Sequence, residues 1–118
     1  TKAELVSETK LLSISKSQIL LNMGQYFESE EIIRDQLLRK NDSPELWFML
    51  SETQKTSQNI VGYHQSRAEY FLLLGQDEKA LNQLEFALQL TQNNFQVSDR
   101  IMTKIIEIKK SLQNSRGL

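Results

Sequence analysis

The side chains that most often carry catalysis or bind metals are scarce in this sequence of 118 residues. It contains one histidine, His64, and no cysteine. A hydrolytic zinc centre needs about three protein ligands, typically with two or more from histidine or cysteine, so His64 cannot build one alone. A lone imidazole on a helix is far more often a packing or surface residue than a ligand. We therefore expect no metal site and no cofactor.

Two other arrangements that could do chemistry have simpler explanations. The carboxylates of Glu30 and Glu31 could serve in acid–base catalysis, but at the start of a helix they are better explained as an exposed pair that the helix dipole stabilises. One histidine and scattered serines do not define a Ser-His-Asp triad. The phosphate-binding patterns GxxxxGK[ST] and GxGxxG are absent. The sequence predicts no catalytic residue, and we expect the chain not to be an enzyme.

The charge balance argues against nucleic acid as a partner. Fourteen basic and fifteen acidic residues nearly cancel, and no stripe of Lys and Arg is present to neutralise phosphates. The one basic cluster, Lys104 with Lys109, Lys110 and Arg116, falls on the last predicted helix, where it opposes the negative end of the dipole. No apolar run approaches the roughly 20 residues of a membrane-spanning helix. We expect no direct membrane insertion.

Hydrophobic spacing predicts an all-α fold. The chain has one proline and four glycines, and its apolar residues recur at steps of three and four rather than two. We expect a single domain over residues 1–118, made of about six antiparallel helices. The expected helices span about 3–23, 26–39, 44–57, 60–74, 77–91 and 95–113.

Local signals set several of these boundaries. Gly24 and Gly75 can adopt the left-handed conformation that ends a helix. At the start of the third helix, Ser43 is expected to cap free amides, Pro44 suits the first helical position, and Glu45 favours the positive end of the dipole. These signals predict short helices of similar length, a pattern typical of helical repeats.

The last helix carries one apolar stripe with charges opposite. Its members, at steps of four, three and four, are Ile101, Ile105, Ile108 and Leu112. Such a helix can end a solenoid without exposing its core, so we expect a C-terminal capping helix. The tail beyond Asn114 has nothing to bury and is expected to fray.

The fourth and fifth helices resemble a tetratricopeptide (TPR) repeat, a 34-residue helix-turn-helix. The matching positions are Ala68, Phe71, Gly75, Ala80, Leu84, Ala87 and Leu88. Small residues such as Ala68 and Ala80 let paired helices approach, while Phe71 and Leu84 fill the seam. The resemblance implies a TPR-like alpha-alpha superhelix.

Earlier parts of the chain carry the same resemblance in a shifted phase. Trp47, Leu50 and Ser51 match residues of the first helix of a TPR repeat. Gly24 and Tyr26 match the residues of its turn. Gln58 lies thirty-four residues after Gly24, whereas Gly75 lies fifty-one after it, or one and a half repeats. The helix expected over 60–74 therefore serves two pairs, which departs from a regular array.

A narrower resemblance covers residues 41–112. The run from His64 to Phe71, followed by Gly75 and by Lys79-Ala80-Leu81, is similar to the C-terminal TPR domain of BepA-like periplasmic zinc metalloproteases. It implies an upstream HExxH protease domain, which is absent from this chain, and a TPR domain that engages outer-membrane assembly partners or client proteins. Because the sequence starts without methionine inside a helical pattern, we expect a C-terminal fragment of a longer protein.

TPR arrays bind partners on the concave wall made by their first helices. Carrying these positions over gives Leu11, Ile14, Gln18, Leu21 and Asn22 on the first helix and Glu45, Phe48, Glu52, Lys55 and Thr56 on the third. The alternative is that several of them are merely solvated or packed against neighbouring helices. Trp47 is expected in the helix seam, with Phe48 about 100° away from it around the helix.

The expected function is that of a non-catalytic protein-protein interaction module. Its partner is a protein or peptide, and the chain itself is expected to be a monomer or weak homodimer. The resemblance places it in the periplasm, as the chaperone-like part of a metalloprotease. Two alternatives are a free-standing TPR adaptor or secretion chaperone in the cytoplasm, and an oligomerising scaffold that joins copies through exposed leucines of the first helix or the stripe of the last.

Overall fold

A computed structural model describes residues 2–115, with side chains described from residue 10 onward. Six helices make up this part of the chain, and it contains no strand. They are α1 (Lys2–Asn22), α2 (Tyr26–Arg39), α3 (Pro44–Thr56), α4 (Ile60–Leu73), α5 (Asp77–Gln89) and α6 (Phe95–Ser115). The starts of α2 to α6 fall where the sequence predicts them, and the ends differ by at most two residues.

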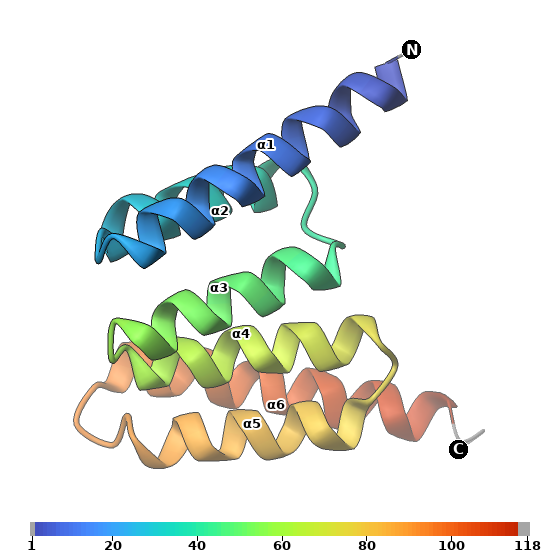
Figure 1. The fold of residues 1–118 in the computed structure, drawn as a ribbon. Helices are drawn as coiled ribbons and strands as arrows, with labels where there is room; N and C mark the ends of the chain where they lie inside the picture. The colour runs from blue at the N-terminus through green and yellow to red at the C-terminus, as the bar shows by residue number, and fades with distance from the viewer. Residues whose placement is uncertain (1, 116–118) are drawn as a thin grey trace.

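The helices are laid side by side in antiparallel order (Figure 1). Each packs mainly on the helices that precede and follow it in the sequence. The molecule measures 43 × 38 × 20 Å, so its thin dimension holds about two layers of helices, each 10–12 Å across. None of the described helices is long and apolar enough to cross a membrane.

Three of the connecting turns have the same geometry. Gly24, Gln58 and Gly75 have φ values of 77°, 68° and 74°. In each turn the next residue donates its amide to the carbonyl five positions back, over 2.8 to 2.9 Å, which is the longer bond of a Schellman motif. Gln58 therefore repeats the turn of Gly24 thirty-four residues later, although it is not a glycine. The chain is helical and repeat-like in this sense.

The expected cap at Ser43 is wrong. The Ser43 side chain makes no capping hydrogen bond, and its buried Oγ has no partner. Pro44 does occupy the first turn, where its missing N–H leaves one fewer free amide at the start of the helix. Beside it, the indole Nε1 of Trp47 donates to the Asn41 carbonyl over 2.7 Å. The start of α3 is thus held by neighbouring groups rather than by the Ser43 side chain.

Small residues lie where paired helices approach closely. Ala68 of α4 and Ala80 of α5 are both fully buried, as expected. Ser17 of α1 and Ser29 of α2 stand fifty-one residues earlier and are equally buried. The Ser29 hydroxyl donates to the Ser17 carbonyl over 2.9 Å, and the two hydroxyl oxygens are 2.7 Å apart. Because these side chains are short, the backbones of each pair can come close.

The described core is divided in two. The larger cluster joins α4, α5 and α6 through eight buried residues: Ala68, Ala80, Leu81, Leu84, Ala87, Ile101, Ile105 and Ile108. The smaller joins α2 and α3 through four, Ile33, Leu37, Leu46 and Leu50, with Ile14 of α1 and Trp47 packed against it. The stripe predicted on the last helix thus faces the larger cluster, and Trp47 lies in a seam as expected.

A buried amide lies between α3 and α4. Gln54 is 2% exposed. In the orientation that suits its neighbours, Nε2 lies 2.6 Å from Ser66 Oγ and 2.9 Å from the Gly62 carbonyl, while Oε1 lies 3.3 Å from an Arg34 guanidinium nitrogen. One side chain therefore bridges α2, α3 and α4.

Two expectations for the chain ends cannot be compared with the structure. The tail predicted to fray falls mainly on residues 116–118, outside the described range, while Ser115 is the last residue of α6. The basic residue Arg116 lies there too. The side chains of residues 2–9 also fall outside the description.

Candidate functional site

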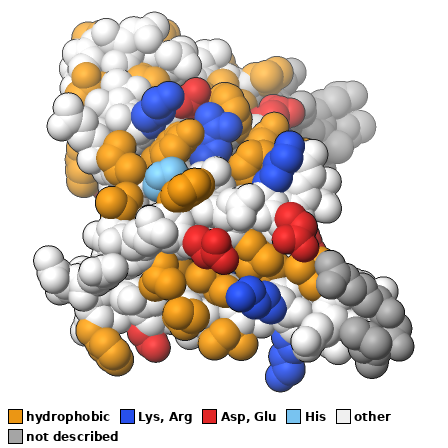
Figure 2. Space-filling model, turned by 90° about the horizontal axis from the view of Figure 1, so that it is seen from below, with side chains coloured by type: hydrophobic (Ala, Val, Ile, Leu, Met, Phe, Trp, Pro, Cys, Tyr) orange, Lys and Arg blue, Asp and Glu red, His pale blue; other side chains and the backbone are white. Residues whose placement is uncertain are grey.

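The face where α4 is exposed between α3 and α5 gathers aromatic rings and basic side chains. We call it the aromatic–cationic face. Its members are Phe48 and Lys55 of α3, Tyr63, Arg67, Tyr70 and Phe71 of α4, and Lys79 of α5. Figure 2 shows the region around the single histidine, where hydrophobic and basic side chains lie side by side.

Helical spacing explains why α4 contributes most of this face. Tyr63, Arg67 and Tyr70 follow one another at steps of four and three, so they lie in one row along the helix. Ala68 points into the larger core and Ser66 towards Gln54. The sides of α4 that carry Ala68 and Ser66 are therefore packed inside the molecule. The row of Tyr63, Arg67 and Tyr70 lies between these two sides, and α3 and α5 flank it.

Each cation of the face lies near a ring. The guanidinium carbon of Arg67 is 4.4 Å from the Phe48 ring centroid and 5.3 Å from that of Tyr63. Lys55 Nζ is 5.9 Å from the Tyr63 centroid. These are cation–π distances, and each is worth about 0.5–1 kcal/mol at exposed sites.

The rings connect these cations into one continuous surface. Phe48 and Tyr70 have centroids 5.5 Å apart, and Tyr70 and Phe71 5.4 Å apart. Lys79 Nζ then lies 5.8 Å from the Phe71 ring. Contacts thus run without a break from Lys55 on α3 across α4 to Lys79 on α5.

Arg67 is held firmly but is poorly satisfied. Its side chain is 18% exposed, and its nearest carboxylate oxygen, on Glu52, is 3.7 Å away. Within the described residues it makes no hydrogen bond, and its buried Nε has no partner. A guanidinium has five N–H donors, and buried donors are normally satisfied. The arrangement therefore leaves donors free at the centre of the face.

His64 sits beside this face as a packing residue. Its Nδ1 is 2.7 Å from Gln83 Oε1 on α5, and its ring lies 5.0 Å from Tyr63 and 5.4 Å from Phe86. The side chain is half-buried. These contacts link α4 to α5 and agree with the role expected for a lone histidine.

The structure brings together three of the binding residues expected on the third helix. Phe48, at 36% exposure, and Glu52 both contact Arg67, and Lys55 shares the Tyr63 ring with it. Glu45 instead lies at the start of α3, 3.6 Å from Lys10 of α1. The exposed Thr56 donates its hydroxyl to the Glu52 carbonyl within its own helix.

The residues expected on the first helix do not join this face. Ile14 is half-buried and packs against the smaller core cluster, so packing explains it. Gln18 donates to Asn22 within the exposed surface of α1, over 3.1 Å. Leu21 is half-buried and Leu11 is exposed. The two sets of expected positions therefore do not form one surface.

Sequence reasoning missed Arg67, Tyr63 and Tyr70 as members of a surface site. A signal was present, because aromatic and basic residues follow one face of the helix at steps of four and three. The TPR phase assigns binding positions to α1 and α3 and none to α4. From the sequence, this stretch of α4 is therefore only part of the family resemblance, and no binding surface is predicted on it.

A cleft lies on another side of α4, and its charges are largely matched. It encloses about 380 Å³ and is lined by side chains that include Arg34, Gln54, Gln65, Arg100 and Lys104. Arg34 pairs with Glu30 at 2.9 Å, and Lys104 pairs with Glu69 at 3.5 Å. Two of its three cations thus have a carboxylate partner within the chain, whereas only Arg67 does among the three cations of the aromatic–cationic face.

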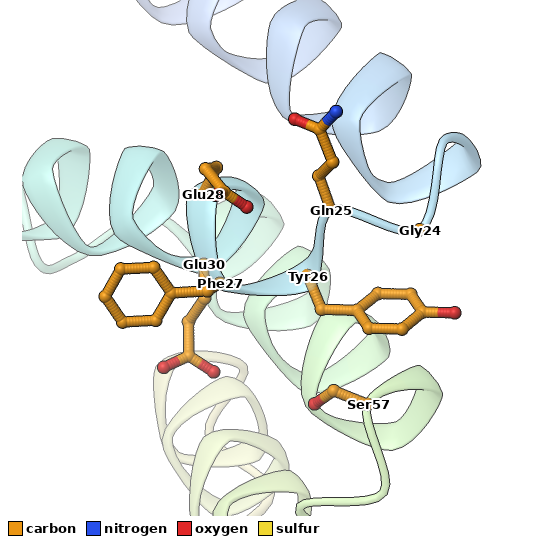
Figure 3. A pocket seen from close by; sticks show the side chains of 7 residues that line it. All are labelled: Gly24, Gln25, Tyr26, Phe27, Glu28, Glu30 and Ser57. Atoms are coloured by element: carbon orange, nitrogen blue, oxygen red, sulfur yellow. The ribbon is translucent and has the colours of Figure 1, made fainter.

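A second hollow, of about 520 Å³, lies at the turn between α1 and α2 (Figure 3). Phe27 and Tyr26 point in different directions from the start of α2, and Ser57 borders the hollow from the end of α3. Glu28 and Glu30 are the charged groups of its lining. The hollow is widely open to solvent, and its lining contains no basic or metal-binding side chain beside these carboxylates. It therefore has few groups that could hold a small molecule.

Among the described residues, no group of three or more His, Asp or Glu side chains comes together as metal ligands would. No protein-family model matches the sequence. A search of curated proteins gives no significant match either. The function must therefore be argued from the geometry of the chain itself.

Proposed function

We propose that the chain is a non-catalytic protein-binding module, and that its aromatic–cationic face contacts the partner polypeptide. The observation that carries this proposal is the continuous series of rings and cations from Lys55 to Lys79. Tyrosine, phenylalanine and arginine are enriched in the centres of protein interfaces, whereas most solvated surfaces lack such clusters.

Partial burial makes this face suitable for binding at low entropic cost. Arg67 is held between the rings of Phe48 and Tyr63, so its side chain has already lost much of its freedom before any partner arrives. Immobilising a flexible side chain on binding costs about 0.5–1.5 kcal/mol. A preorganised arginine avoids much of that cost.

The same proposal includes a TPR-like superhelix as the framework. It is supported by the 34-residue spacing of the left-handed turn residues Gly24 and Gln58. The small buried pairs Ser17–Ser29 and Ala68–Ala80 add to it, because close helix crossings are what the repeat requires. On this proposal α6 is the capping helix, since its buried stripe ends the larger core.

For the parent protein, we propose the TPR part of a periplasmic HExxH metalloprotease or chaperone that engages outer-membrane assembly partners or clients. The resemblance of residues 41–112 supports this proposal. A cytoplasmic TPR adaptor or secretion chaperone is the alternative. The reading frame upstream of this segment separates the two, because the first requires an HExxH sequence and an export signal.

An oligomerising scaffold is a second candidate because the first helix pair exposes large apolar side chains. These are Leu11, Leu12, Ile19 and Met23 near α1 and Phe27 and Leu38 on α2. Scattered apolar exposure is common, so a measurement must decide. Sedimentation velocity from low to high concentration tests self-association, and a monomer throughout that range excludes the scaffold.

Site-specific photo-crosslinking tests the binding face. A photoreactive phenylalanine analogue is placed at Tyr70, within the face, or at Phe95, which is 82% exposed at the start of α6. Both proteins are checked for helical content and incubated with extract of the source cells. We expect adducts with defined polypeptides at Tyr70 and few at Phe95.

The contrary result is equally clear. Adducts that are as abundant and as varied at Phe95 as at Tyr70 would show that the face has no special role. Adducts confined to Phe95 would move the binding surface to α6. In either case the proposal for the aromatic–cationic face would be given up.

A further inference from the structure

From the excess of positive charge on this face, we infer that it binds an acidic segment of a polypeptide, and that Arg67 receives one of its carboxylates. The inference rests on the proposed function and specifies the chemistry of its partner. The rings would take apolar side chains between the acidic ones. The partner's own acidic side chains, rather than its chain terminus, supply the charge.

The first argument is charge complementarity. Lys55 and Lys79 form no ion pair with any described residue, and Arg67 has only the long contact to Glu52. Three cations at the rim and centre of one apolar face create a positive potential that favours negative partners. They lie on three different helices, so a single terminal carboxylate cannot meet them all.

The second argument is the state of Arg67 itself. Its guanidinium is stacked on Phe48 and Tyr63, its Nε is buried without a partner, and the Glu52 oxygen at 3.7 Å is too distant for a hydrogen bond. A planar guanidinium pairs with a carboxylate through two parallel hydrogen bonds of about 2.7–2.9 Å. Because Nε is buried, the incoming carboxylate pairs with the two terminal nitrogens, which are not fully buried and make no hydrogen bond with the described residues.

The third argument concerns Glu52, which we assign as an internal substitute for the partner's carboxylate. It holds Arg67 by charge without completing hydrogen bonds, and its side chain is 39% exposed. A partner must compete with this carboxylate for the same guanidinium. Removing its charge should therefore strengthen binding.

The test uses blocked peptides of ten residues and the complete chain. In the acidic probe, glutamate alternates with phenylalanine and leucine; matched probes carry glutamine or lysine in place of glutamate. A fourth probe is the glutamine peptide with a free C-terminal carboxylate. Binding is followed by NMR, through the Nε–Hε resonance of Arg67 and the backbone amides of α3, α4 and α5.

We expect the acidic probe to shift the Arg67 resonance and to bind about tenfold more tightly than the glutamine probe. The affinity should fall as salt rises from 0.05 to 0.5 M. Glu52→Gln should tighten binding severalfold. Arg67→Lys keeps the charge but loses the planar fork, so it should weaken binding about tenfold, whereas Lys110→Gln on α6 should have no effect.

Each other outcome overturns the inference. Equal binding of the glutamine probe on the same amides would refute the charge requirement while leaving a protein-binding face. A response to the free C-terminus alone would replace acidic side chains by a chain terminus. No binding of any probe would refute the acidic-segment inference, and the crosslinking result would still judge the proposed function. If Arg67→Lys is misfolded, the other two variants decide: the inference requires weaker binding of the acidic probe by Lys79→Gln and tighter binding by Glu52→Gln, and the absence of both changes refutes it.

Discussion

At the scale of single residues, the molecule depends on polar side chains placed where apolar ones would be expected. Gln54 is as buried as the leucines of the core, and its amide reaches three helices. Buried amides without partners cost about 1–3 kcal/mol, whereas satisfied ones fix the relative position of their neighbours. Single substitutions of such residues should therefore have large effects on stability.

Replacing Gln54 with alanine should lower the free energy of unfolding by about 2–4 kcal/mol, because it removes hydrogen bonds and leaves a cavity between α3 and α4. Urea denaturation followed by circular dichroism measures this change. Gln89→Ala, at an exposed site on α5, is the matched control, with an expected effect below about 0.5 kcal/mol. Similar effects for the two variants would contradict the role given to Gln54.

Gln58 is the one described residue other than glycine with a positive φ. Replacing it with glycine should stabilise the chain by about 0.5–1 kcal/mol, because the left-handed conformation strains a side chain with a Cβ. Gly24→Ala, at the equivalent turn, should destabilise by about 1 kcal/mol. Thermal unfolding compares the two, and a loss of stability in Gln58→Gly would show that its side chain matters more than its backbone.

At the scale of helices, two pairs fifty-one residues apart use different chemistry for the same close approach. α4 and α5 meet through Ala68 and Ala80, whereas α1 and α2 meet through Ser17 and Ser29. The short bond between the two hydroxyls exists only while both serines are present. The first pair is therefore sensitive to the loss of one serine in a way that the second pair is not.

Ser29→Ala should cost about 1 kcal/mol, because it leaves the Ser17 hydroxyl with only a 3.4 Å contact to the Ser29 carbonyl. Ser17→Ala should cost less, because the Ser29 hydroxyl still donates to the Ser17 carbonyl. The double variant recreates the alanine pair of α4 and α5, so it should cost no more than one single variant. A double-mutant cycle in urea measures this coupling. Additive effects would show that the two hydroxyls act independently.

At the scale of the whole molecule, the apolar core is uneven. Eight buried residues hold α4, α5 and α6, and four hold the earlier helices, with Gln54 between the two groups. Local stability follows the amount of buried apolar contact. The two ends of the described chain should therefore open with different free energies.

Amide hydrogen exchange should be about tenfold or more slower in α5 and the middle of α6 than in α1 and α2. Exchange measured by mass spectrometry on peptic fragments gives this comparison directly. Gln54→Ala should widen the difference, because it loosens the link between the halves. Uniform protection across all six helices would mean that the chain opens as a single unit.

The helices could be predicted from the sequence because glycine, proline and apolar spacing act locally. The same local reasoning found Ala68 and Ala80 in the α4–α5 crossing and the stripe of α6. It failed at Ser43, whose capping depends on side-chain direction, and at Ser17 and Ser29, which have no apolar character to mark them. Phe48, Glu52 and Lys55 were anticipated, but the row on α4 that unites them was not, because surface faces emerge only when neighbouring helices are placed.

The packing of each helix on its neighbours in sequence has a consequence for how the chain acquires its structure. Contacts between segments close in sequence need only short loops to close, so little entropy is lost before they form. Such chains reach the native state within microseconds to milliseconds, and a hairpin can form as soon as its two helices have left the ribosome. We therefore expect rapid refolding from urea in stopped-flow experiments, with no slow step that requires distant parts of the chain to meet.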